Sequence, residues 1–334
     1  MLGICLLTIS VSAQERSPYQ TKSLSANKIN SVYARTSGGN ILVSGVNASE
    51  ARIEIYVSAG NKSLSNDEIS KRLKEDYDLT IEVEGSKLIA TTESRHSFGN
   101  WRNQLNVSYK IYVPSEVTTD LGTSGGSIDL SNLRGSQSFS TSGGGLALDR
   151  VAGKIRGKTS GGSIRLKECK DDIVLSTSGG GIQASDCSGE LRLNTSGGSI
   201  ELQTLDGDIE VETSGGSIRG EAVRGKLYAR TSGGPIKMRN LECGLDASTS
   251  GGMIDVEISK AVAAVTLNNS GGNVKLLMPS DKGLNLRLRG DRISVTDLKN
   301  FNGDQDEESI TGKVNGGGIP VSVSTNGTLT FSLK

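Results

Sequence analysis

The chain has 334 residues, of which 34% are hydrophobic and 4% aromatic, less apolar material than a globular domain of this length usually contains. Lys plus Arg and Asp plus Glu both number 37, so no excess of basic charge marks a nucleic-acid-binding face. The 44 glycines recur in register, which excludes flexible low-complexity sequence and favours a repeat protein with a narrow core.

Residues 1–13 form an apolar run that closes on small residues, the pattern of a secretory signal peptide cleaved after Ala13. No later segment is apolar for long enough to span a membrane, so no transmembrane segment is predicted. We therefore predict an exported protein of the periplasm, the cell surface or the medium.

Residues 14–28 are polar and are predicted to form a flexible leader. Residues 29–57 are predicted to form a first repeat turn, because residues 31–39 closely echo residues 226–234. The repeat then breaks off.

Residues 58–122 are predicted to form a small α+β insertion or N-terminal cap. Ser65 and Glu68 form a capping box, which predicts a short amphipathic helix that ends near Tyr77. Residues 79–91 alternate around a Gly and predict a hairpin, and residues 106–113 predict a further strand.

Residues 123–274 contain a regular repeat that begins with Thr-Ser-Gly-Gly every 18 residues. Counted from the threonine as position 0, apolar side chains recur at positions 5, 7, 10, 14 and 16, which predicts two short strands per repeat. Position 5 shows the pattern best: Ile128, Leu146, Ile164, Ile182, Ile200, Ile218, Ile236 and Ile254. Gly-Gly is expected at one corner and a glycine at position 12 at another.

The repeat predicts an all-β fold: a right-handed, single-stranded β-solenoid or β-helix with 18-residue turns. One repeat cannot fold alone, since five inward side chains at roughly 1.5–3 kcal/mol each do not offset ordering 18 residues at roughly 1–2 kcal/mol each. Stacking supplies the difference. Outward charges are expected to alternate in sign between turns, with Glu201 stacked near Arg219, Glu221 near Arg239, and Arg192 near Glu210, and we interpret these pairs as a solvated surface and not a site.

Residues 275–334 keep strand-like runs but lose the period, and we interpret them as degenerate turns and a C-terminal cap. Such a cap protects the edges of the last turn from pairing with other chains.

These features carry a resemblance. A predicted strand at residues 107–114 precedes successive turns of the pattern T-S-G-G-x-I-x-L-x-x-L-x-G. A glycine-rich tail with a degenerate form of this pattern follows. Over about residues 29–334 this resembles the bacterial putative-adhesin domain family of unknown function. The resemblance implies a β-solenoid of the cell envelope and supplies no catalytic residues to transfer.

Cys169 and Cys187 occupy the same inward position on successive turns. Stacked strands would place their Cα atoms within disulfide range, and an exported protein permits oxidation. Cysteine is equally suited to act as a small buried hydrophobic residue. Both interpretations remain open at this point.

No catalytic residue, metal site or cofactor is predicted. Calcium-binding β-rolls need a recurring Asp that this repeat lacks, and His96 is the only histidine, which argues against a His-based metal site or triad. A polysaccharide-active β-helix enzyme is the main enzymatic alternative, but it needs clustered carboxylates, and here they are interleaved with Lys and Arg. The regular Thr-Ser column also raises ice binding as an alternative, against the simpler interpretation that these hydroxyls bond backbone groups at the corner.

The sequence favours a non-enzymatic binding scaffold whose partner is a glycan or an envelope or host protein. The candidate partner-binding residues are His96, Phe98, Trp101 and Arg102, in a loop of the 58–122 segment that holds the only Trp and the only His. The alternative is that Phe98 and Trp101 plug the open end of the solenoid.

Overall fold

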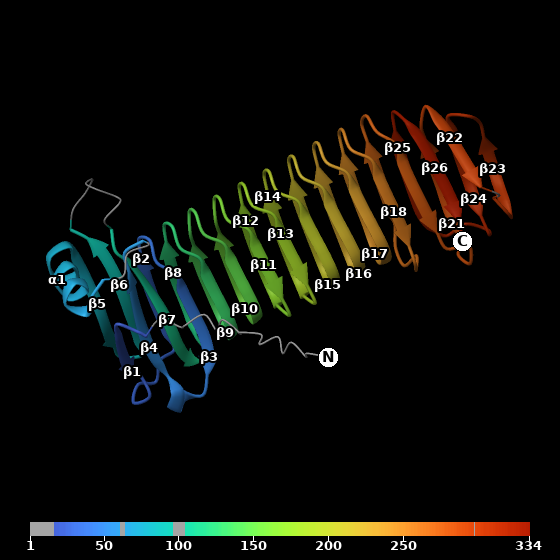
Figure 1. Cartoon of the computed structure of the whole chain (residues 1–334). Coiled ribbons are helices and arrows are strands. Elements are labelled where there is room, and N and C mark those ends of the chain that lie inside the picture. The colour runs from blue at the N-terminus through green and yellow to red at the C-terminus, as the bar shows by residue number, and fades with distance from the viewer. Residues whose placement is uncertain (1–16, 61–63, 96–103, 297) are drawn as a thin grey trace, which may run out of the picture.

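The computed structural model describes residues 17–60, 64–95, 104–296 and 298–334. Within them the chain has an all-β fold, as predicted: strands stack side by side along an elongated body, with one α-helix at the N-terminal end (Figure 1). The predicted signal peptide at 1–13 lies outside the described residues.

Parallel strand pairing holds the stack together, and each residue is paired in register with the residue one full repeat later. Ile128 pairs with Leu146, Leu146 with Ile164, and Ile200 with Ile218. The pairing strands of this region are β9 (Ile128–Ser140), β10 (Leu146–Lys158), β11 (Ile164–Lys167), β12 (Lys170–Thr177), β13 (Ile182–Ser185), β14 (Ser188–Thr195), β15 (Ile200–Thr213), β16 (Ile218–Thr231), β17 (Ile236–Thr249), β18 (Ile254–Ile258) and β19 (Val265–Asn269).

The core consists of columns of inward-pointing side chains, in which a small residue on one turn makes room for a larger residue on a neighbouring turn. The position 5 column is at most 1% exposed throughout. A Cβ on Gly220 would lie 2.5 Å from Sδ of Met238, and a Cβ on Gly157 would lie 2.1 Å from the Phe139 ring, so each glycine makes room for a larger neighbour. Gln137 interrupts the apolar position 14 column but is fully satisfied, since its side chain bonds Thr119 and the Val117 carbonyl.

The Thr-Ser-Gly-Gly corner is held by the threonine hydroxyl. Thr195 Oγ1 donates to the Gly180 carbonyl of the preceding turn at 2.8 Å and accepts from the Gly198 amide at 3.2 Å. The same two bonds recur from Thr141 to Thr249. Asn269, which replaces Thr in the variant corner, repeats both with its side-chain amide.

The second glycine of the corner is required by close approach of stacked backbones. A Cβ on Gly198 would lie 2.1 Å from the Gly180 carbonyl oxygen, whereas a Cβ on Gly197 would lie 3.6 Å from its nearest neighbour. Neither glycine has a φ in the left-handed region, unlike the position 12 glycines, such as Gly153 at 110°.

A further bend, which the sequence did not reveal, lies at position 9. Seven residues there have φ between 53° and 55°, a conformation costly for side chains other than Gly, Asn and Asp. They are Asn132, Arg150, Glu168, Asp186, Thr204, Ala222 and Asn240.

The early repeat copy stacks directly on the regular turns. Thr36 pairs with Thr123 and Ile41 with Ile128, so the intervening chain leaves the stack after the first turn and returns to it. Strands β2 (Ser31–Thr36) and β3 (Ile41–Val46) make this turn, followed by a short 3-10 helix (Ala48–Glu50), and β8 (Thr118–Thr123) rejoins it.

The intervening chain builds the N-terminal end of the body (Figure 1). The helix α1 (Asn66–Asp76) begins as predicted, with Ser65 accepting from the Glu68 amide, and the predicted hairpin and strand are also present. The remaining elements of this end are β1 (Gln20–Ser23), β4 (Arg52–Ser58), β5 (Tyr77–Glu84), β6 (Lys87–Ser94) and β7 (Asn106–Pro114).

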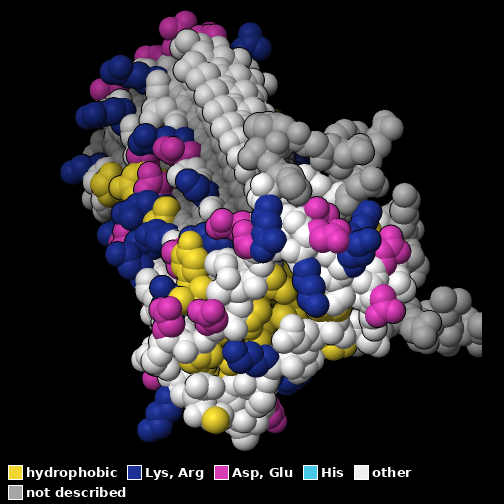
Figure 2. Space-filling view, turned by 90° about the vertical axis from the view of Figure 1, so that its left-hand side faces the viewer, with side chains coloured by type: hydrophobic (Ala, Val, Ile, Leu, Met, Phe, Trp, Pro, Cys, Tyr) yellow, Lys and Arg dark blue, Asp and Glu magenta, His cyan; other side chains and the backbone are white. Residues whose placement is uncertain are grey.

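Seen from this end, acidic and basic side chains are interspersed around a band of exposed hydrophobic surface (Figure 2). Leu79, Ile81 and Val83 on β5 are only partly buried. Among the described residues β5 pairs with β6 alone, and Lys22 Nζ donates to the Ile81 carbonyl at 3.0 Å.

The C-terminal end departs from the repeat because antiparallel pairing enters. β21 pairs with β24 and β24 with β23 in antiparallel register, which closes one face of the last turns. The elements are β20 (Val274–Met278), β21 (Leu284–Arg289), β22 (Arg292–Thr296), β23 (Phe301–Gln305), β24 (Ser309–Val314), β25 (Ile319–Thr325) and β26 (Thr328–Leu333).

Substitution by alanine should lower stability at the second corner glycine and leave it nearly unchanged at the first. Gly198→Ala should lower the free energy of unfolding by roughly 1–3 kcal/mol, because the added methyl forces the Gly180 carbonyl away. Gly197→Ala is the matched control, expected within about 0.5 kcal/mol of wild type. Urea denaturation of both variants checks this, and equal losses would contradict the close-approach explanation.

Exchange of side chains at position 9 should change stability in a reciprocal way. Thr204→Asn should raise the free energy of unfolding by about 1 kcal/mol, because Asn tolerates positive φ and a β-branched residue does not. Asn240→Thr should lower it by a similar amount. Both residues are exposed, so denaturation measures the backbone effect; a loss of stability in Thr204→Asn would refute the left-handed bend.

Candidate functional site

The predicted binding residues His96, Phe98, Trp101 and Arg102 lie outside the described residues, so their hypothesis stays a prediction. The described aromatic residues nearby are structural. Tyr109 is buried and hydrogen-bonded to Thr92. Tyr77 is buried and its hydroxyl accepts from the Leu105 amide at 2.8 Å.

Two other aromatic side chains of this end are half-buried beneath cations. The Arg52 guanidinium lies 3.8 Å from the centre of the Tyr112 ring, and Lys110 Nζ lies 4.8 Å from that of Tyr56. Glu54 accepts from Arg52 at 2.7 Å and from Tyr56 at 2.8 Å. Burial opposes ionisation of Glu54, but these two hydrogen bonds outweigh it and lower its pKa.

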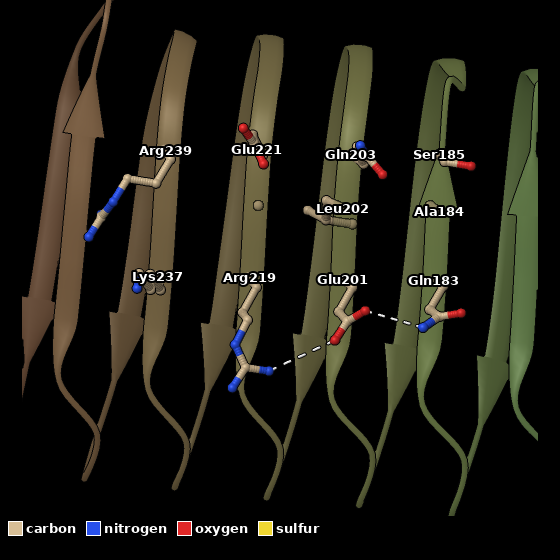
Figure 3. Close-up of a pocket in the computed structure, with 11 residues that line it drawn as sticks. Gln183, Ala184, Ser185, Glu201, Leu202, Gln203, Arg219, Glu221, Lys237 and Arg239 are labelled. Carbon is tan, nitrogen blue, oxygen red and sulfur yellow. Dashed lines mark hydrogen bonds and ion pairs between the residues drawn. The ribbon is translucent and has the colours of Figure 1, made fainter.

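An open groove lies on the regular turns, and we call it the cross-strand groove (Figure 3). It has a volume of about 560 Å³ and crosses β13, β15, β16 and β17. Its floor is made by Ala184, Leu202 and Gly220, between a first row, Gln183, Glu201, Arg219 and Lys237, and a second row, Ser185, Gln203, Glu221 and Arg239.

The repeat itself builds the two walls. Positions 6 and 8 point outward on either side of inward position 7, and stacking in register aligns them across successive turns. Along each row an amide is followed by a carboxylate and then by a guanidinium. The second row repeats this order one turn later than the first. Opposite charges therefore face each other across the groove only on β16, where Arg219 and Glu221 stand two residues apart.

The first row is loosely paired. Gln183 Nε2 donates to Glu201 Oε2 at 3.2 Å, and Arg219 Nη1 lies 3.9 Å from Glu201 Oε1 (Figure 3). The expected Glu201–Arg219 pair is thus present but long. Both side chains are more than half exposed, so the pair is worth at most about 1 kcal/mol.

In the second row Glu221 and Arg239 stack on neighbouring strands, as predicted, but they form no ion pair. The Arg239 side chain points away from Glu221 (Figure 3). It binds Asp255 of the next turn, with Nη2 at 2.5 Å from Oδ2 and Nη1 donating to the Asp255 carbonyl. It also lies 3.9 Å from Glu257, which Lys334 binds at 2.5 Å. Two carboxylates on the following turn attract Arg239 more strongly than Glu221 alone.

Three groove side chains are left without a bonded partner. Among the described residues, no hydrogen bond or ion pair involves the side chains of Gln203, Glu221 or Lys237. The groove therefore offers an unused amide, carboxylate and ammonium within two neighbouring rows. The third expected pair, Arg192 with Glu210, is confirmed at 3.3 Å and lies away from the groove.

A second hollow, of about 540 Å³, follows the Thr-Ser corner. Its threonines, such as Thr159, Thr177 and Thr195, are only 5–6% exposed because their hydroxyls bond the backbone. The simpler interpretation of the corner is thus confirmed for Thr. An ice-binding surface would rest on the serine column alone.

The inward cysteines are free, buried thiols. The Cys169 amide donates to Cys187 Sγ at 3.4 Å, and Cys187 Sγ donates to the Ser185 carbonyl at 3.1 Å. The side-chain hydrogen bond between the two thiols raises the pKa of Cys187, as does burial, and the same bond lowers the pKa of Cys169. Burial raises the pKa of Cys243 to about 12. Cys187 and Cys243 therefore behave as core residues.

No group of three His, Cys, Asp or Glu residues could hold a metal ion within the described part of the chain. In the same residues, no helix has the length and hydropathy needed to cross a bilayer.

No protein-family model and no curated protein sequence matches the chain. Three solved structures are similar over nearly the whole chain. A putative cell adhesion protein from Clostridium sporogenes is 10% identical, with 94% of this chain and 98% of that chain covered and a TM-score of 0.20. Putative adhesins from Parabacteroides distasonis and Bacteroides fragilis are 11% and 13% identical, covering 93% and 94% of this chain and 96% of each of theirs, with TM-scores of 0.29 and 0.23. At these TM-scores the similarity supports no conclusion about function.

Proposed function

We propose that this chain is a non-enzymatic, exported binding scaffold of the cell envelope, an adhesin-type protein that binds a glycan or another protein. Its body would be a right-handed, single-stranded β-solenoid with 18-residue turns, in which the repeat provides rigidity and the outward side chains provide recognition. The in-register parallel pairing of β9 to β17 supports this architecture.

The observation that carries the proposal is the cross-strand groove. Its polar side chains are not needed by the fold: they point outward, vary from turn to turn, and leave Gln203, Glu221 and Lys237 unbonded. Concave surfaces with a few convergent polar groups are where proteins usually bind ligands. A rigid ladder also holds these groups at fixed spacings, which lowers the entropic cost of binding.

A polysaccharide-active enzyme is the second candidate, since Glu201 and Glu221 stand on adjacent strands of the groove. Glycosidases use two carboxylates that flank the scissile bond. Here Glu201 already accepts a hydrogen bond from Gln183 and lies near Arg219, an environment typical of a surface ion pair. Binding without turnover is therefore the function we propose.

Export and binding can be tested together. In fractionated cells that express the gene, the protein should be in the envelope or the medium and absent from the cytoplasm, because residues 1–13 resemble a signal peptide. The purified exported form should be retained on isolated cell envelopes or on an immobilised glycan and protein panel.

The same panel, incubated overnight and assayed for reducing ends, should release no oligosaccharides. A cytoplasmic location, or absence of retention on every surface, would contradict the scaffold proposal. Clear release of sugar would replace it with the enzymatic alternative.

A further inference from the structure

The cross-strand groove also indicates what kind of ligand it accepts. We infer that the groove binds a single extended strand of uncharged polysaccharide, which lies across β13, β15, β16 and β17. The main hydrogen-bonding groups of the groove are the side chains of Gln203, Glu221 and Lys237. This inference rests on the proposed function.

The first step of the argument is the direction and length of the groove. It crosses successive parallel strands, so a linear ligand in it runs along the stack (Figure 3). Four strands at the usual spacing span roughly 14 Å between the first and the last. A pyranose unit in an extended glycan has nearly the length of one strand spacing, so consecutive sugars would meet equivalent positions on consecutive turns.

The second step is charge. The unbonded groups include one carboxylate, Glu221, and one ammonium, Lys237, while Arg239 is engaged by Asp255. A polyanion would place its charges against Glu201 and Glu221, and a polycation would meet Arg219 and Lys237. Both arrangements bring like charges together, which weakens binding of a polyanion and of a polycation. The groove therefore favours a ligand without net charge.

The third step is hydrogen bonding. Lys237 only donates, Glu221 only accepts, and the Gln203 amide does both. Sugar hydroxyls both donate and accept, so one neutral glycan strand can satisfy all three side chains.

A peptide fits the groove less well. Peptides add to sheets mainly by backbone pairing at a free edge, with pockets for alternate side chains. The groove crosses four strands whose backbones already pair with one another, and its floor at Ala184 and Gly220 lies between two continuous rows, without separate side-chain pockets.

The test uses neutral hexasaccharides: cellohexaose, xylohexaose, mannohexaose and chitohexaose. Binding to the exported protein is measured by isothermal titration calorimetry. The matched charged probes are hexagalacturonate and the fully deacetylated chitosan hexamer. We expect at least one neutral hexasaccharide to bind at least tenfold more tightly than either charged one.

Two variants locate the binding. Gln203→Ala/Glu221→Ala should weaken the neutral hexasaccharide at least tenfold, since two of its three fixed partners are lost. The control, Lys226→Ala, removes an exposed charge from the second half of the β16 turn and should leave affinity within twofold. The substituted groups are exposed, and unchanged circular dichroism and thermal midpoints would show that both variants fold.

Several outcomes would overturn the groove assignment alone. One is an equal loss of affinity in the control and the double variant, and another is unchanged affinity in the double variant. A third is tighter binding of a charged probe than of every neutral hexasaccharide. The fourth is that wild-type protein binds no hexasaccharide although it is still retained on envelopes. Loss of retention on every surface would instead remove the binding scaffold itself. Cleavage of a bound hexasaccharide would show that the groove is an active site.

Discussion

The contact on which the rest of the structure depends is the approach of stacked backbones at the Thr-Ser-Gly-Gly corner. The second glycine leaves no room for a Cβ, since Gly198 would place one 2.1 Å from the Gly180 carbonyl oxygen. That same carbonyl accepts the Thr195 hydroxyl, so the closest point of the stack is also hydrogen-bonded. Because a slip of one residue would lose both features in every turn at once, the corner sets the register of the inward columns.

The register explains why recognition can be placed on the repeat. Inward positions are constrained by packing, as Gly220 with Met238 and Phe139 with Gly157 show, whereas outward positions 6 and 8 are free to differ between turns. The cross-strand groove arises from this freedom. Its walls are held at strand spacing by the core beneath them, and on β17 the Arg239 side chain turns away to bind Asp255.

Much of the fold could be predicted because its signals repeat. The apolar columns, the corner hydroxyls and the position 12 glycines each recur with the same kind of residue in most turns, and the Ser65 capping box is local. The left-handed bend at position 9 could not be predicted, because its residues share a conformation but no side-chain chemistry. The groove was missed for a related reason: Glu221 and Arg239 stack as predicted, but the outward charges were interpreted only as a solvated surface, and the sequence did not reveal that Asp255 and Glu257 attract the Arg239 guanidinium from the next turn.

The central claim is that successive repeats stack in parallel, one strand spacing apart. It is tested most directly by pulsed electron-electron double resonance between two nitroxide labels, each attached to a cysteine that replaces an exposed corner serine. The background is Cys5→Ser, in which the other native thiols are buried. With one label at Ser142 and the other at Ser196, Ser214 or Ser232, the distance should rise by about 4.8 Å per turn, to roughly 14, 19 and 24 Å. Distances that fail to increase with each added turn would contradict the stacked architecture, and with it the origin of the groove.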